Sequence, residues 1–189
     1  MAMLAASPTI ASAHVGIGDT GGFAHGFWHP IGGIDHVLTM IMVGVLAAQL
    51  GGRALCLVPA AFVSVMVIGG AVGLAGIWIP FVQLGIGLSI VVLGTAVALG
   101  LRIMIPAAMA LVGFFAFFHG YAHGADMPEN VARLAYGAGF AIATALLHAS
   151  GLALGLVIAS KAGRRGESLV RIAGAIVAVA GGALVTGVI

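Results

Sequence analysis

The sequence predicts an all-α integral membrane protein, folded as a compact bundle of about six transmembrane helices with its N-terminus outside. Hydrophobic residues fill 62% of the 189 positions and charged residues only 6%, with a mean hydropathy of +1.24, whereas soluble domains carry about 25% charged residues. Charged or glycine-rich breaks separate apolar stretches of about 20 residues, the length that crosses a bilayer. Nearly all basic residues lie in alternate breaks, as expected of a multi-pass protein.

The breaks divide the chain into six predicted spans: residues 31–50, 55–76, 81–101, 104–123, 131–159 and 168–188. The fifth span is longer than a bilayer requires, so we expect it to tilt or to begin above the membrane. Small residues recur at four-residue spacing and permit close helix packing in lipid. This pattern predicts a compact bundle and nothing finer, and a homo-oligomer is left open. The pairs are Gly69/Gly73, Gly151/Gly155 and Ala178/Gly182.

The basic residues predict the orientation of the bundle. Six of them fall on one side of the six-span arrangement, and only Arg133 falls on the other. Because positive charge is retained in the cytoplasm, the breaks after the first, third and fifth spans are expected inside. The N-terminus, the 124–130 loop and the C-terminus are then outside. The six inner residues are Arg53, Arg102, Lys161, Arg164, Arg165 and Arg171.

The first residues have the pattern of a cleavable leader. Ala11-Ser12-Ala13 is a small-residue sequence of the kind that precedes signal-peptidase cleavage. We therefore predict a signal segment at 1–13 and a single six-helix transmembrane domain at 14–189. Cleavage would make His14 the N-terminal residue, with a free amine beside its imidazole. The alternative is that His14 is a solvated loop residue.

A first cluster of ionisable residues lies where the first span begins. If the segment from His29 is helical, His36 lies two turns further on the same face, beside Asp35, and Met40 lies one turn below. Pro30 suits the first turn of such a helix. A carboxylate below the membrane interface costs about 2.5–3.5 kcal/mol unless it is paired or wet. We therefore expect Asp35 and His36 to be functional, and Met40 to be a packing residue, with a soft metal ligand as the alternative.

A second cluster lies at the end of the fourth span. His119 and His123 are one helical turn apart, and Asp126 follows three residues later, on the same face if the helix continues that far. Imidazole nitrogens and carboxylate oxygens suit nickel, cobalt, zinc, copper or iron, and the absence of a nearby cysteine disfavours a thiolate site. The two clusters therefore predict a divalent-metal site at the outer face.

Two further histidines stand apart from these clusters. His148 lies near the middle of the fifth span, far in sequence from any charged residue of that span. It is expected to be a second station for the ion or a proton relay, the alternative being a hydrogen bond to a carbonyl. His25 precedes the first span in a glycine-rich stretch, so we expect it to be solvated, with metal binding as the alternative.

Composition also excludes several functions. No basic run is dense enough to hold nucleic acid. No Gly-x-x-x-x-Gly-Lys-Ser/Thr sequence is present, so nucleotide hydrolysis by such a loop is excluded. The expected partners are a divalent ion and the lipid bilayer, and no enzymatic activity is expected.

The two clusters resemble the signature motifs of a known family. His29-x5-Asp35-His36 and Phe118-His119-Gly120-x-Ala122-x-Gly124 are similar to the two motifs of HupE/UreJ proteins. These are small bacterial membrane proteins associated with hydrogenase and urease gene sets and regarded as nickel or cobalt permeases. His123 occupies a variable position of the second motif, and Asp126 stands where that motif often continues with Glu.

The resemblance implies an inner-membrane importer of Ni²⁺, or of Co²⁺, for metalloenzyme maturation, with no resident cofactor. It also implies that His29, Asp35, His36 and His119 are required for transport. We expect uptake to weaken below about pH 6, because protonated imidazole does not bind metal. The alternative is a membrane metal- or haem-binding enzyme, or a metal sensor that does not transport.

Overall fold

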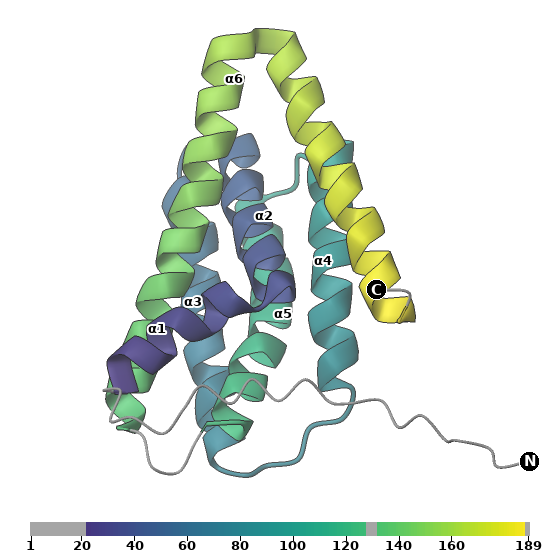
Figure 1. The fold of residues 1–189 in the computed structure, drawn as a ribbon. Helices are drawn as coiled ribbons and strands as arrows, with labels where there is room; N and C mark the ends of the chain where they lie inside the picture. Colours follow the sequence, from purple (N-terminus) through teal and green to yellow (C-terminus); the bar gives the residue numbers. More distant parts are fainter. Residues whose placement is uncertain (1–21, 128–131, 188–189) are drawn as a thin grey trace, which may run out of the picture.

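The chain folds entirely into helices wherever its structure is described. The computed structural model describes residues 22–127 and 132–187, so the predicted leader at 1–13 and His14 lie outside the described residues. No strand occurs in the described ranges, which confirms the predicted all-α class (Figure 1). The helices are α1 (Gly22–Gly32), α2 (Ile34–Leu50), α3 (Ala54–Leu74), α4 (Val82–Leu99), α5 (Ile105–Ala125) and α6 (Arg133–Thr186).

The predicted spans agree with the helices to within a few residues, except for the first. Helices α3, α4 and α5 are each long and apolar enough to cross a membrane. Helix α6 contains two such segments, Arg133–Lys161 and Arg165–Thr186. They are joined at Gly163, whose φ of 49° lies in the left-handed region that favours glycine. The protein is therefore a multi-pass helical membrane protein.

The first span is not the single helix that the sequence predicts. Helices α1 and α2 meet at an angle of 82°. Pro30 lies near the end of α1 instead of in the first turn of the span, and Gly33 between the two helices is extended, with φ −99° and ψ 118°. Proline removes a helical donor and glycine frees the backbone, so the chain bends here. His29 and His36 consequently do not share one helix face.

The two ends of the bundle differ in charge, as the sequence predicts. The connections from α2 to α3 and from α4 to α5 lie at the same end as the bend of α6 (Figure 1). That end carries most of the basic residues. Helix α1, the start of α2 and the end of α5 lie at the opposite end, which carries the histidine motifs. The basic residues are Arg53, Arg102, Lys161, Arg165 and Arg171.

Helix α5 packs against α3 through glycines on both helices. A Cβ atom added at any of four glycines would overlap a backbone carbonyl oxygen of the facing helix. This contact confirms the close approach predicted from Gly69/Gly73, and it shows that the two glycines of the second motif fix α5 against α3. The facing pairs are Gly69 with Phe117, Gly73 with Tyr121, Gly120 with Met66, and Gly124 with Gly70.

Helix α2 meets α6 in the same way. A Cβ atom at Gly44 would overlap the carbonyl oxygen of His148, and one at Gly151 would overlap that of Ile41. The predicted pair Ala178/Gly182 differs, because a Cβ atom at Gly182 would have no neighbour within 4 Å among the described residues. Backbone contact between α2 and α6 thus fixes the position of His148.

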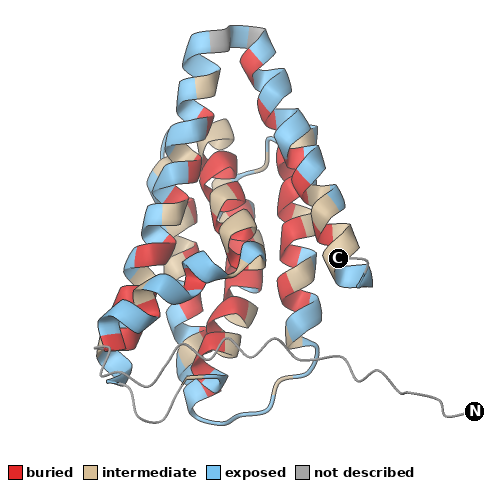
Figure 2. Ribbon diagram, in the orientation of Figure 1, coloured by how far each residue is buried: buried red, intermediate tan, exposed pale blue. Residues whose placement is uncertain are grey.

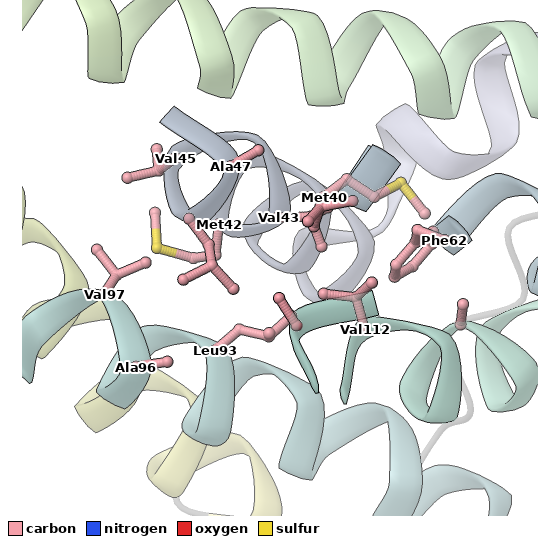
Figure 3. Close-up of a cluster of buried hydrophobic side chains, with 14 of the residues drawn as sticks. Met40, Met42, Val43, Val45, Ala47, Phe62, Leu93, Ala96, Val97 and Val112 are labelled. Atoms are coloured by element: carbon pink, nitrogen blue, oxygen red, sulfur yellow. The ribbon is translucent and has the colours of Figure 1, made fainter. Parts of the chain in front are cut away.

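The apolar core is centred on α2. Buried residues cluster on the inner faces of the helices (Figure 2), and Met42 to Ala47 of α2 are buried without a break. Such a run is typical of a helix surrounded by others. Met40, Phe62 and Val112 pack in this cluster (Figure 3), in agreement with the packing role expected for Met40.

Candidate metal-transport site

The two histidine motifs meet in space. The ring centroids of His36 and His123 are 4.4 Å apart, and those of His36 and His119 are 4.6 Å apart. The ring of His29 reaches over from α1 and lies 4.7 Å from that of His123. Helices α1, α2 and α5 therefore contribute to one outer cluster, which we define as His29, His36, His119 and His123.

Asp35 fixes the tautomer of His36. Its Oδ1 atom accepts a hydrogen bond from the backbone N–H of His36 at 2.9 Å and lies 2.9 Å from Nδ1 of the same residue. Since a carboxylate only accepts, Nδ1 carries the proton and Nε2 keeps its lone pair, as in carboxylate–histidine–metal triads. A Cβ atom at Gly33 would lie 2.8 Å from this carboxylate oxygen. The glycine thus makes room for the pair.

The unprotonated nitrogen of His36 accepts a hydrogen bond from Nε2–H of His123 in the second motif. Nε2 of His36 and Nε2 of His123 are 2.5 Å apart. Two imidazoles that bind one ion at adjacent positions have nitrogens about 3 Å apart, given metal–nitrogen distances near 2.1 Å. A cation could replace the proton of this hydrogen bond if the two rings separated slightly. Within residues 22–127 and 132–187, however, no three His, Cys, Asp or Glu side chains converge as a complete metal site.

Two hydroxyl groups orient the ring of His119. Its Nε2 atom lies 3.0 Å from Oγ of Ser89, which donates its proton to the carbonyl of Ile86 and lies 2.8 Å from Oγ1 of Thr39. Because the serine has only one proton, Nε2 of His119 must be the donor in their bond. Nδ1 of His119 then holds the lone pair, and it is buried without a hydrogen-bond partner in the described ranges.

Sequence reasoning missed several residues of this site. Ser89 and Thr39 are fully buried between α2, α4 and α5, and their only signal in the sequence is a hydroxyl inside an apolar span. Tyr136 of α6 is also buried, and its ring lies 5.7 Å from that of His25 and 6.0 Å from that of His29. Nothing in its local sequence distinguishes it from an interface tyrosine.

Two predicted residues lie at the margin of the outer cluster. Helix α5 ends at Ala125, and Asp126 is its exposed cap residue, whose backbone N–H still donates to the carbonyl of Ala122. A role for Asp126 at the site stays a prediction. His25 is exposed, as expected, with its ring 6.1 Å from that of His29.

His148 lies deeper in the bundle than the outer cluster. It is 1% exposed, and its ring packs edge to face on Phe62 with centroids 4.9 Å apart. The ring of Phe62 also lies 5.9 Å from that of His119. Neither ring nitrogen of His148 has a hydrogen-bond partner within the described part of the chain. The bond to a carbonyl, which the sequence left as an alternative, is not formed.

Comparison with known proteins identifies the family. The family described as HupE/UreJ protein matches residues 1–184. This chain belongs to the HupE/UreJ family. One relative, Protein HupE of Rhizobium leguminosarum bv. viciae, is 43% identical over 182 residues, which cover 96% of this chain and 93% of the relative. No solved structure matches.

In this HupE/UreJ protein, the hydrogen bonds of the histidines determine which ring nitrogens could bind a metal ion. Two tautomers are set by hydrogen bonds, so His36 offers Nε2 and His119 offers Nδ1. Neutral imidazole nitrogens are ligands for borderline divalent ions such as nickel and cobalt. With no complete set of three ligands in the described residues, water would have to complete the shell of an ion held there.

Replacing Asp35 with Asn tests the role of its charge. The amide oxygen of Asn still accepts the backbone hydrogen bond, but it no longer holds the Nδ1 proton of His36 with a full charge. We expect metal affinity to fall about 10–100-fold, the usual effect of losing such a partner. Equilibrium dialysis with nickel measures it, with the exposed Glu167→Gln, at the opposite end of the bundle, as the control. Unchanged affinity in Asp35→Asn would show that the charge is not used.

Proposed function

We propose that this protein is an inner-membrane importer of Ni²⁺, with Co²⁺ as the second candidate, that supplies metalloenzyme maturation. The observation that carries the proposal is the pair of Nε2 atoms of His36 and His123, which come from the two motifs and face each other at 2.5 Å. Nitrogen donors favour borderline divalent metals. The choice of nickel rests on membership of the HupE/UreJ family together with the permease function that the motif resemblance implies.

In the proposed path the ion enters at the histidine end of the bundle. His29 on α1 meets it first, and His36 with His123 then replaces part of its water shell, with His119 beside them. The ion next passes His148 towards the basic end. A site that transports must also release its ion, and an incomplete ligand set suits that requirement.

The direction of transport follows from the charge of the two ends. Basic loops remain in the cytoplasm, so the histidine end would face outside. An inside-negative potential then contributes about 2.3 kcal/mol per charge per 100 mV to the entry of a cation. We propose that this potential, or trapping of the ion in the cytoplasm, drives uptake.

Reconstituted vesicles test the proposal directly. We expect vesicles with the purified protein to accumulate radioactive nickel under an inside-negative potential. The double variant Asp35→Ala/His36→Ala should fall to the rate of empty vesicles, while Glu167→Gln should match the wild type. Normal nickel flux through the double variant would contradict the proposed transport mechanism. Metal binding without flux would instead favour a sensor, and a Soret band in the purified protein would favour a haem protein.

A further inference from the structure

We propose that the basic end of the bundle binds the phosphate headgroup of an anionic phospholipid, of the phosphatidylglycerol type, between Arg102 and Arg171. The site lies at the opposite end of the bundle from the outer cluster, and it depends neither on transport nor on the identity of the ion. A hollow beneath the bend of α6, the placement of two guanidinium groups and the net charge of the lining point to this ligand.

The hollow lies where the helices of the bundle end on the basic side. The two segments of α6 diverge from their bend, and the ends of α2 and α4 lie between them (Figure 1). Gln49 of α2, Gly100 after α4 and residues of both α6 segments line a space of about 260 Å³. One water takes about 30 Å³ of liquid volume, so a phosphate group with its ester substituents fits there.

Two guanidinium groups from different parts of the chain line this hollow. Arg102 belongs to the connection between α4 and α5, and Arg171 to the second segment of α6. Nε of Arg171 donates a hydrogen bond to the carbonyl oxygen of Ala98 at 2.8 Å, which holds this side chain across the end of α4. Among the described residues, no ion pair neutralises either arginine. Their remaining N–H groups are therefore available to phosphate oxygens, which guanidinium groups bind in a bidentate way.

The charge of the lining favours a ligand with one negative charge. Glu167 also lines the hollow, so two guanidinium groups and one carboxylate leave one net positive charge. The phosphodiester of phosphatidylglycerol carries one negative charge and balances it. A phosphatidylcholine headgroup has no net charge and would bring a quaternary ammonium group close to the arginines. A divalent cation is disfavoured for the same reason, because like charges repel.

The rest of the lining favours a lipid over a soluble anion. Ala48, Ala159 and Val170 give the hollow an apolar part beside the arginines. Such side chains contribute nothing to the binding of hydrated phosphate, whereas they suit the ester and first methylene groups of a lipid. The hollow also lies at the depth where α2 and α4 end, which is the depth of the headgroups. Basic pockets between helices on the cytoplasmic side commonly bind lipid headgroups.

Diffuse attraction of lipid by all the basic residues makes a different prediction. Arg53 is exposed at the same end of the bundle, in the connection between α2 and α3, but it does not line the hollow. If only total charge mattered, loss of Arg53 would weaken lipid binding as much as loss of Arg102. If the hollow is a site, only Arg102 matters.

Native mass spectrometry of the whole detergent-solubilised protein, titrated with lipid, tests the site. We expect one phosphatidylglycerol to remain bound per wild-type chain, and phosphatidylcholine to be lost. Arg102→Gln should weaken the binding about fivefold, the typical effect of one basic side chain near an anionic headgroup. Arg53→Gln should match the wild type. Ala159→Phe keeps every charge but fills the hollow, so it should also lose the lipid.

Three outcomes would overturn the site. They are equal weakening by Arg102→Gln and Arg53→Gln, unchanged binding in Ala159→Phe, and equal retention of phosphatidylcholine and phosphatidylglycerol by the wild type. Displacement of the lipid by millimolar inorganic phosphate would assign the hollow to a soluble anion instead. The last two comparisons use the wild type alone, so they decide the matter even if a variant does not yield monodisperse protein. Failure of nickel transport would leave all these measurements unchanged.

Discussion

Replacing His123 with alanine is expected to reduce nickel uptake to the background of cells without the protein. The substitution removes the nitrogen that faces Nε2 of His36 and the ring that contacts His29, so it disconnects α1 from the α2 part of the cluster. Initial rates of radioactive nickel uptake, normalised to the amount of protein in the membrane, measure the effect. The result is informative because the motif resemblance does not assign a role to His123, and the expectation rests on its spacing from His119 and its contact with His36.

Two controls make that experiment specific. Asp126→Ala should retain near-normal uptake, because this residue is exposed beyond the end of α5. His123 also packs against Phe140, with ring centroids 4.2 Å apart, so His123→Gln is added to preserve side-chain volume and should also lose uptake. Normal transport by His123→Gln together with loss in Asp126→Ala would reverse the assignment and place the ion nearer the loop.

Replacing Gly120 with alanine is expected to destabilise the whole bundle. A Cβ atom at this position would overlap the carbonyl oxygen of Met66, an atom of the helix backbone that no side-chain rotation can move. Overpacking costs about 1–3 kcal/mol and occasionally more, and a backbone clash belongs at the upper end of that range. Thermal unfolding in detergent and the yield of monodisperse protein measure the loss.

The matched control is Gly137→Ala on α6. Gly137 is also inside a helix, but a Cβ atom there would have no neighbour within 4 Å among the described residues. Alanine is favoured over glycine in helices by up to about 1 kcal/mol, so this variant should be as stable as the wild type or slightly more so. Equal stability of Gly120→Ala and Gly137→Ala would contradict the role given to the α3–α5 contact.

Much of the architecture could be predicted from the sequence because its signals are local. The lengths of the apolar stretches predicted the spans. The breaks at 51–53 and 100–102 each contain an arginine, and these arginines predicted that both breaks lie at the cytoplasmic end. The meeting of His36 with His119 then followed, since both lie at the outer ends of their spans. The architecture of a membrane protein is easier to predict from its sequence, because the bilayer restricts its helices to a few directions.

The bend between α1 and α2 could not be predicted in the same way. Proline is accepted in the first turn of a helix and also lies here in the last turn of one, so Pro30 alone does not say which helix it belongs to. Packing determines which helix includes Pro30, because α1 packs on α6 and buries Gly22, Gly26 and Pro30 in doing so. Tertiary contact also explains why Ser89, Thr39 and Tyr136 were missed.

The contact between α3 and α5 has a consequence for anyone who wishes to change the preferred ion. Because backbone meets backbone at Gly120 and Gly124, His119 and His123 move only together, as parts of one rigid block. Helix α1 is fixed in the same way against α6, because a Cβ atom at Gly26 would overlap the carbonyl oxygen of Tyr136. The side chain of His29 is exposed, whereas those of His36, His119 and His123 are buried, so engineering of selectivity has most freedom at His29 and least in the face of α5.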